Sequence, residues 1–161
     1  MAKYKKALIV GRFQPFHLGH KYLIEKALEL ADTVIIGLGS SNITDDKNPF
    51  SLETRKSFIQ EFLIQEKLNS KILEIIPIED VPNDDEWMRI IEGKVKEIDV
   101  VIGDNDWVNG IFEKRKIPVV KIGYLKRHIL TGTEIRKNMK EKKSWEERVP
   151  SYLVPYIKNA V

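Results

Sequence analysis

Two histidines stand three residues apart in the stretch GRFQPFHLGH, which spans Gly11–His20 and follows the apolar run ALIV. Imidazole rings donate hydrogen bonds to phosphate oxygens, and the glycine before the second histidine lets a ligand approach the backbone. Arg12 adds a permanent charge with several donors. A helix that begins here would also direct its free N–H groups at an anion. The stretch therefore predicts a turn that receives the phosphates of a nucleotide.

The same residue types are compatible with two alternatives. One is an ordinary connection between a strand and a helix, with both histidines at the surface. The second is a zinc site, but this needs a third ligand, and the only other histidine is His128. We therefore predict no metal site built from the protein's own side chains.

A second candidate anion site is the stretch TGTEIR, from Thr131 to Arg136. Thr131, followed three residues later by Glu134, matches the capping box that starts a helix. The free amides of such a helix, the threonine hydroxyls and Arg136 can all point at one phosphate group. A helix that is merely well capped gives the same pattern.

Short apolar runs alternate with helical patterns along the chain, which indicates strands buried on both faces. Phe58 and Phe62 belong to an apolar helical stripe that predicts a crossover helix. Later in the chain we expect short helices broken at Pro150 and Pro155. The predicted fold is α/β, a Rossmann-like doubly wound parallel sheet of five strands with short C-terminal helices. The predicted strands are Ala7–Val10, Val34–Gly39, Ile72–Ile78, Asp99–Gly103 and Ile117–Gly123.

Composition limits the class of protein. The 161 residues, 42% hydrophobic and 32% charged, suffice for one buried core, so we expect a single domain over residues 1–161. A net charge of +3 gives no indication of a nucleic-acid partner. The absence of cysteine excludes disulfides and thiolate metal sites, and the first apolar run is too short for a signal sequence or membrane span. We expect a cytoplasmic protein that binds neither nucleic acid nor membrane.

Two common nucleotide-binding motifs are missing. GLGSSN, from Gly37 to Asn42, begins like the dinucleotide-binding G-x-G-x-x-G, but Asn42 replaces the third glycine and a loop-rich stretch follows. No G-x-x-x-x-G-K-[ST] occurs, which excludes a P-loop ATPase. The basic run Lys137–Lys143 is interpreted as a solvated helix face.

Together the two candidate stretches resemble a known family. HLGH matches the HxGH motif of the nucleotidyltransferase superfamily, and TGTEIR stands where that superfamily carries its ISSTxxR-like motif. With NPF at Asn48–Phe50, the chain resembles the archaeal type of nicotinamide mononucleotide (NMN) adenylyltransferase over nearly its whole length, less closely at Gly103–Val108. The resemblance implies that the NMN phosphate attacks the α-phosphorus of ATP directly and in line, which gives NAD and pyrophosphate.

The resemblance also implies roles for single residues. His17, His20 and Arg136 would be catalytic, with His20 nearest the transferring group, and Mg²⁺ would be bound through the ATP phosphates. Relatives assemble as homo-oligomers, commonly hexamers, so an oligomer is expected. The other implied contacts to ATP or its phosphates are Gly11, Arg12, Phe13, Gly19, Lys47, Thr131, Gly132 and Thr133.

On the acceptor side, Asp80 and Trp87 keep the spacing of the archaeal type, which implies that Trp87 stacks on the nicotinamide ring. Asp84 stands where relatives commonly carry the Asn that recognises the amide, and it is the third implied NMN contact. A core aromatic is the alternative interpretation of Trp87. Lys47 reaches phosphate or is a solvated loop lysine.

Two other functions remain open. A sibling nucleotidyltransferase would act on pantetheine phosphate or flavin mononucleotide (FMN). A regulator would bind nucleotides without catalysis. Trp87 favours NMN over the sibling acceptors, and the intact His17, His20 and Arg136 favour catalysis over sensing.

Overall fold

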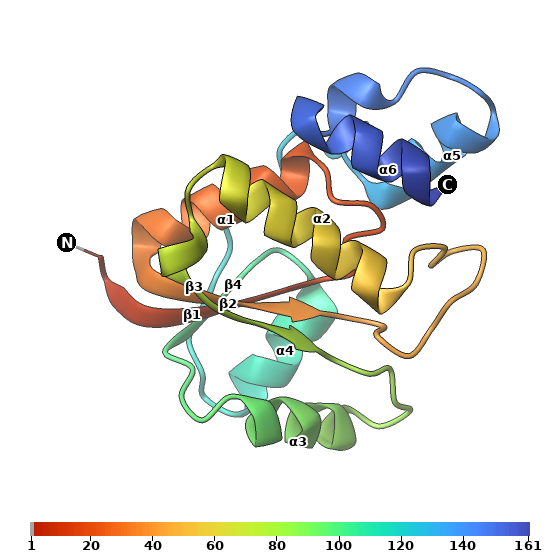
Figure 1. Cartoon of the computed structure of the whole chain (residues 1–161). Coiled ribbons are helices and arrows are strands. Elements are labelled where there is room, and N and C mark those ends of the chain that lie inside the picture. The colour runs from red at the N-terminus through yellow and green to blue at the C-terminus, as the bar shows by residue number, and fades with distance from the viewer. Residues whose placement is uncertain (1) are drawn as a thin grey trace.

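The computed structural model describes residues 2–161, and a parallel sheet of five strands lies at its centre (Figure 1). The strand order is β3-β2-β1-β4-β5, and every neighbouring pair is parallel. The order changes direction between β1 and β4, where open α/β sheets bind their ligands. The predicted doubly wound fold is confirmed. The strands are β1 Tyr4–Gly11, β2 Ala31–Leu38, β3 Ile72–Pro77, β4 Val100–Ile102 and β5 Val119–Val120.

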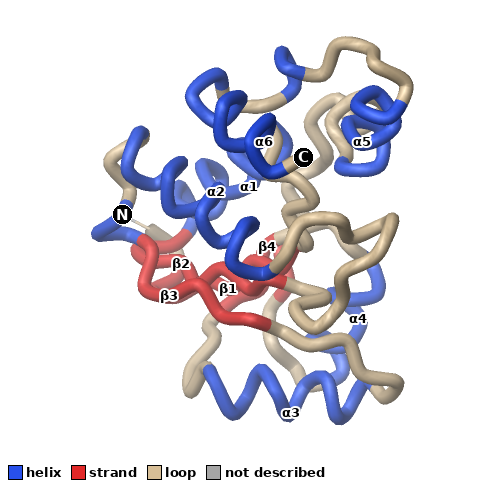
Figure 2. The backbone as a smooth tube through the Cα atoms, turned by 45° about the vertical axis from the view of Figure 1, so that its right-hand side comes forward, coloured by secondary structure: helices blue, strands red, loops and turns tan. Residues whose placement is uncertain are grey.

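Helices cover both faces of this sheet (Figures 1 and 2). On one face lie α1 (Leu18–Leu30) and α2 (Leu52–Gln65), and on the other lie α3 (Asp84–Lys94) and α4 (Asp106–Lys114). The C-terminal helices lie on the side of α1 and α2. They are α5, Gly132–Lys140, and α6, Val154–Ala160. Single 3₁₀ turns occur at Asn69–Lys71, Glu146–Arg148 and Ser151–Leu153.

Successive strand residues supply two separate cores. Ala7 and Ile9 pack with α1, α2 and the C-terminal helices, whereas Leu8 packs with α3 and α4. Ile36 and Ile35 of β2 divide between the two cores in the same way. Side chains alternate across a strand, so an apolar run with no polar break must be covered on both faces.

Two details differ from the sequence-based expectation. Pro155 lies in the first turn of α6, where its missing N–H is not needed, so the prediction that it breaks a helix is wrong. Pro150 does separate two short helical turns, as expected. The last strand is only Val119–Val120 long, because the chain then leaves the sheet to line a pocket. In the described part of the chain, no helix is long and apolar enough to cross a membrane.

Candidate active site

The histidine pair forms the cap of α1. Nδ1 of His17 accepts a hydrogen bond from the N–H of Gly19 (3.0 Å), and Nδ1 of His20 accepts one from the N–H of His17 (3.1 Å). The two rings stack with centroids 3.8 Å apart. Because each Nδ1 is an acceptor, the proton of each neutral ring must be on Nε2.

Burial keeps both rings uncharged near neutral pH. It lowers the pKa of His17 from 6.5 to about 4. The pKa of His20 is lowered well below its ordinary value, by burial first and by the neighbouring His17 second. The backbone N–H that donates to each Nδ1 fixes the tautomer, so each neutral ring offers one donor, Nε2–H.

Gly19 and Phe13 hold this arrangement in place. A Cβ at residue 19 would lie 2.7 Å from the His17 ring, so only glycine leaves room for the cap. The buried Phe13 ring stacks on His20 at a centroid distance of 4.2 Å. Its phenyl ring therefore lies behind the histidine, where it supports the imidazole.

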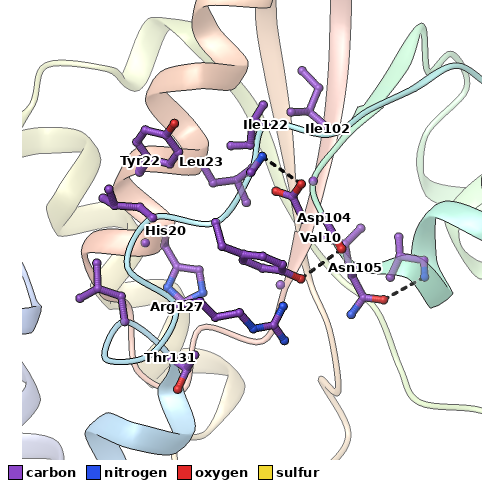
Figure 3. A pocket seen from close by; sticks show the side chains of 18 of the residues that line it. Val10, His20, Tyr22, Leu23, Ile102, Asp104, Asn105, Ile122, Arg127 and Thr131 are labelled. Atoms are coloured by element: carbon purple, nitrogen blue, oxygen red, sulfur yellow. Dashed lines mark hydrogen bonds between the residues drawn. The ribbon is translucent and has the colours of Figure 1, made fainter.

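A cavity of about 240 Å³ opens beside the histidines, at the carboxyl ends of β1 and β4 (Figure 3). Apolar side chains such as Val10, Leu23 and Ile122 form part of its wall. The cavity brings together both stretches that the sequence singled out. The predicted site residues that line it are Gly11, His17, Gly19, His20, Thr131 and Gly132.

The start of α5 is pressed against the histidine turn. The Thr131 hydroxyl accepts from the N–H of Glu134 (3.1 Å), which confirms the threonine half of the predicted capping box. Arg136 donates through Nη1 to the carbonyl of Gln14 (2.6 Å). A Cβ at Gly132 would lie 2.7 Å from that Nη1 and 2.8 Å from the Gln14 carbonyl oxygen. Glycine is therefore required where the two stretches meet.

Arg12 and Arg136 give this region its positive charge. Burial lowers the pKa of Arg136, and the positive charge of Arg12 lowers it further. Arg12 is exposed and donates to Oδ1 of Asn48 (3.3 Å). Thr133 Oγ1 is 3.5 Å from Nη2 of Arg136, whereas the exposed Lys47 has the setting of a loop lysine. None of these four residues lines the cavity itself.

Asp80, after β3, is held by the loop that follows β2. The Ser40 hydroxyl donates to Oδ1 of Asp80 (3.0 Å). The side chain of Asn42 pairs with both the N–H and the carbonyl of Asp80 (2.8 and 3.2 Å). Asn42, which breaks the dinucleotide-binding pattern, therefore fixes a residue of the expected acceptor side.

Trp87, for which stacking on nicotinamide and a place in the core were both open, is covered by other side chains. It is only 3% exposed and packs on Trp107 (centroids 5.0 Å apart) and Phe112 (6.1 Å). Trp107, in the first turn of α4, is 51% exposed, and its Nε1–H donates to Oδ1 of Asp84 (3.2 Å). The core interpretation of Trp87 thus fits the structure, and Trp107 is the open aromatic surface beside Asp84.

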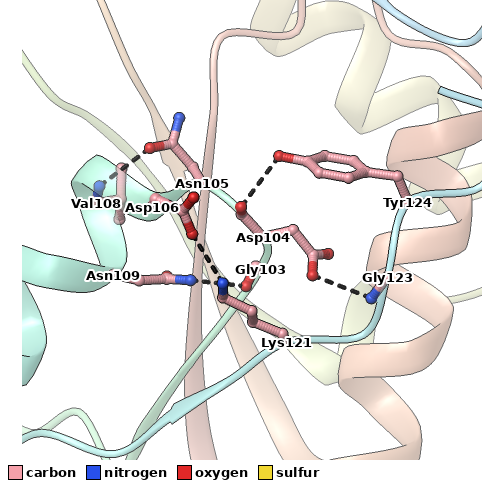
Figure 4. Close-up of polar contacts among 9 residues, drawn as sticks. All are labelled: Gly103, Asp104, Asn105, Asp106, Val108, Asn109, Lys121, Gly123 and Tyr124. Carbon is pink, nitrogen blue, oxygen red and sulfur yellow. Dashed lines mark hydrogen bonds and ion pairs between the residues drawn. The ribbon is translucent and has the colours of Figure 1, made fainter. Parts of the chain in front are cut away.

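The far wall of the cavity was not predicted from the sequence. Asp104 accepts from the N–H of Gly123 (3.0 Å) through its carboxylate, and its carbonyl accepts from the Tyr124 hydroxyl (3.1 Å) (Figure 4). Arg127 lies over the Tyr124 ring at 3.9 Å and also lines the cavity. The signals in the sequence were position, because Asp104 and Asn105 follow β4 after the single residue Gly103, and the weaker resemblance at Gly103–Val108.

Within residues 2–161, no three His, Cys, Asp or Glu side chains are grouped so that they could hold a metal ion. His128 is exposed and lies outside the cavity wall, so it does not join the other histidines.

Comparisons with known proteins identify the family of the chain. The model of the cytidylyltransferase-like family matches residues 8–155. The nicotinamide-nucleotide adenylyltransferase of Thermoplasma acidophilum is 35% identical over 96% of this chain and 86% of its own, and that of Pyrococcus furiosus is 36% identical over 96% and 83%.

A solved structure shares the fold. It is a bifunctional NMN adenylyltransferase/ADP ribose pyrophosphatase from Francisella tularensis, complexed with AMP and manganese. It is 27% identical, with a TM-score of 0.76 over 91% of this chain, which spans only 44% of that longer protein. The chain belongs to the cytidylyltransferase-like family and, within it, to the nicotinamide-nucleotide adenylyltransferases.

Proposed function

We propose that the cavity binds the adenosine of ATP and that its phosphates lie between the histidine turn and the start of α5. The observation that carries this proposal is the backbone bond to each Nδ1, which leaves the Nε2–H groups of His17 and His20 as the available donors of the two rings. Both histidines line the cavity, and the described residues contain no acidic cluster of metal-binding type. Neutral donors of fixed orientation suit an anion whose charge grows during reaction.

In the proposed reaction, an oxygen of the NMN phosphate forms a bond to the α-phosphorus of ATP. The bond from that phosphorus to the bridging oxygen of the β-phosphate breaks, and pyrophosphate leaves. The nucleophile is already anionic, so the site needs no general base; it needs alignment and donors for the growing charge. His20 would serve the transferring phosphate, and His17 would donate beside it.

The leaving pyrophosphate would be held from the other side. Arg136, Arg12 and Thr133 are the proposed partners of the β- and γ-phosphates, together with the free amides at Thr131 and Gly132. Gly11 and Gly19 would let the chain approach the nucleotide. Lys47 would contact phosphate only if its exposed side chain changed conformation. Arg127 is a further candidate, because it carries a permanent charge at the cavity wall.

A divalent cation would accompany the nucleotide. The described residues provide no protein cage, and Mg²⁺ is commonly held through substrate phosphates. We therefore assign magnesium to the ATP phosphates, where it would neutralise the charge of the leaving group.

For the acceptor, the proposed contacts are Asp80, Asp84 and the aromatic pair Trp87 and Trp107. The comparisons favour NMN over pantetheine phosphate, FMN or a purely sensory role, because the relatives are nicotinamide-nucleotide adenylyltransferases. The bound products would be NAD and pyrophosphate.

We further propose that residues 1–161 act as a single nucleotidyltransferase domain, because both cores share one sheet. A homo-oligomer, as in the hexamers expected from the resemblance, is part of the same proposal. Light scattering after size-exclusion chromatography measures the assembly directly, and a monomer at micromolar concentration would contradict it.

Direct transfer is tested by stereochemistry. With ATP that carries a chiral sulfur-substituted α-phosphate, a single in-line displacement inverts the configuration at phosphorus. Retention would instead require two displacements and a covalent adenylyl-enzyme, which the proposed mechanism does not contain.

A further inference from the structure

Arg55, in α2, is completely buried and bonded to four main-chain carbonyls. Its Nη1 donates to the carbonyls of Arg12 (2.9 Å) and Gly39 (2.7 Å). Its Nη2 donates to Ser40 (3.2 Å), and its Nε to Ser51 (3.4 Å). One guanidinium therefore ties together the chain just beyond β1, the chain just beyond β2 and the start of α2.

This arginine has no carboxylate partner. Among residues 2–161, no carboxylate oxygen lies within 4.0 Å of its nitrogens. The carboxylate of Asp80 acts on Arg55 only at longer range, where it partly offsets the lowering of the Arg55 pKa by burial. A buried charge without a directly paired counter-ion is expensive, and a packed apolar side chain would often serve stability as well or better. A planar guanidinium group does something that an apolar side chain cannot: its several donors fix the relative positions of several acceptors at once.

The bond from Nη2 of Arg55 to Ser40 connects the guanidinium group to the expected acceptor side. Ser40 has a left-handed backbone, with φ of 51°, and its hydroxyl donates to Oδ1 of Asp80 (3.0 Å). The bond from Arg55 to the Ser40 carbonyl holds this strained residue. Arg55 thus holds the backbone from which the Ser40 hydroxyl reaches the carboxylate of Asp80.

The bond from Nη1 of Arg55 to Arg12 connects the guanidinium group to the expected phosphate side. The carbonyl that Arg55 holds belongs to Arg12, the first residue after β1. The side chain of Arg12 is exposed and donates to Asn48 in the loop before α2, and its charge lowers the pKa of Arg136. Fixing the Arg12 peptide fixes the base of a side chain that is proposed to meet pyrophosphate.

We propose that Arg55 is a positioning residue that sets the two half-sites relative to each other, the phosphate side through Arg12 and the acceptor side through Ser40 and Asp80. This inference rests on the proposed function, since it takes the assignment of the two substrates from there. Arg55 touches neither substrate. It acts by holding two turns at the distance that lets the NMN phosphate reach the α-phosphorus in line.

The test is a kinetic comparison of Arg55→Lys with Ser40→Ala. Lysine keeps the charge but cannot reach the carbonyls of three segments, so kcat/KM should fall about 10- to 100-fold for both ATP and NMN, the scale of a misaligned reactant. Ser40→Ala keeps the Cβ and the backbone bond to Arg55, and it should raise KM for NMN alone. Because both changes act on Asp80, their effects on NMN should be less than additive in the double variant.

A core variant in another helix that makes no contact with the Arg55 guanidinium group, Ile157→Ala in α6, controls for lost stability. It should lower the melting temperature and leave the kinetics of the folded enzyme unchanged. Wild-type kinetics in folded Arg55→Lys, or full additivity with Ser40→Ala, would overturn the inference. A wild-type enzyme that forms no NAD at all would instead overturn the proposed function.

If Arg55→Lys does not fold, nitrogen NMR of the arginine side chains in the wild-type protein decides the question. A buried guanidinium held by four carbonyls should give slowly exchanging, resolved signals. These signals should shift when either ATP or NMN is added alone. Signals that stay unmoved with both nucleotides would show a purely structural arginine.

Discussion

The ring of His20 is oriented by the backbone of His17, whose N–H donates to Nδ1 of His20 at 3.1 Å. Since His17 itself caps the helix through Gly19, the order of residues in HLGH is what sets both tautomers. His17, Gly19 and His20 therefore form one hydrogen-bonded unit, which presents two Nε2–H donors to the cavity. The consequence is that the two nitrogens of each ring can be tested separately.

Replacing His20 by Asn or Gln separates capping from donation. The Asn oxygen can accept from the His17 N–H in place of Nδ1, so His20→Asn should fold normally but lose turnover by about 100- to 1,000-fold, the scale for one lost donor to a growing charge. His20→Gln places an amide N–H near the position of Nε2, so it should keep more activity and lose about 1 kcal/mol of stability with the cap.

Steady-state kinetics and urea unfolding measure both effects. The His20→Ala variant lacks both the Nδ1 acceptor and the Nε2–H donor. Its turnover should fall by about two to four orders of magnitude. Equal turnover in the Asn and Gln variants would mean that donation from Nε2 is not what catalyses the reaction.

Stability should fall in acid because His17 is buried in its neutral form. Its pKa is about 4 in the folded protein and 6.5 ordinarily, so the unfolded chain binds a proton at a higher pH than the folded one. The stabilisation is complete above pH 6.5 and is lost as pH falls toward 4; at pH 4.5 the loss from this residue is about 2 to 3 kcal/mol. His20 adds to it in the same direction.

Urea unfolding at pH 7.5 and pH 4.5 measures this loss. His17→Asn is the matched control, because its amide oxygen can cap the helix without titrating. Its stability should depend less on pH than that of the wild type. The same pH dependence in both proteins would contradict the buried neutral imidazole.

Gly132→Ala should impair the use of ATP. The added Cβ meets Nη1 of Arg136 at 2.7 Å and the Gln14 carbonyl oxygen at 2.8 Å, so the contact between α5 and the histidine turn must open. A shift of about 1 Å there should lower kcat/KM for ATP about 100-fold. In Gly110→Ala, a Cβ meets nothing within 4 Å, so activity should be unchanged and helix stability slightly higher. Equal ATP kinetics in the two variants would count against this role of the contact.

Trp107→Ala should weaken the binding of NMN and leave the binding of ATP unchanged. Trp107 is the half-exposed aromatic face on this side, and stacking of a base-like ring on an aromatic is worth about 1 to 3 kcal/mol, or about 5- to 150-fold in Kd. Trp107→Phe keeps a ring but loses the N–H that orients Asp84, so it should show a smaller loss. Isothermal titration with NMN measures this series. Tighter binding by Trp107→Ala would show instead that Trp107 only covers Trp87.

The sequence was sufficient for the features that depend on local pattern. Apolar runs such as ALIV must be strands buried on both faces, and the glycine-spaced histidines must stand where a strand turns into a helix. The structure has Ala7 and Leu8 on opposite faces and His17 as the cap of α1. These outcomes follow from periodicity and capping, which act over a few residues.

The features that escaped prediction depend on long-range packing. Arg55 lies among charged residues of a helix and resembles a surface arginine, yet its bonds reach Arg12 and Gly39, in two other segments. Trp87 had the spacing of a stacking residue, but only the packing of α3 against α4 puts Trp107 over it. Such contacts depend on how whole elements meet, which no short window of sequence contains.

Adenylyl transfer to NMN is decided by the products that the purified protein forms. The protein, with ATP and Mg²⁺, is supplied with NMN, phosphopantetheine or FMN, and NAD and pyrophosphate are quantified. With NMN, NAD and pyrophosphate should appear in equal amounts, and pyrophosphate release with the other two acceptors should be far slower. Equal or faster release with phosphopantetheine or FMN, or no NAD from NMN, would show that the chain does not carry out this reaction.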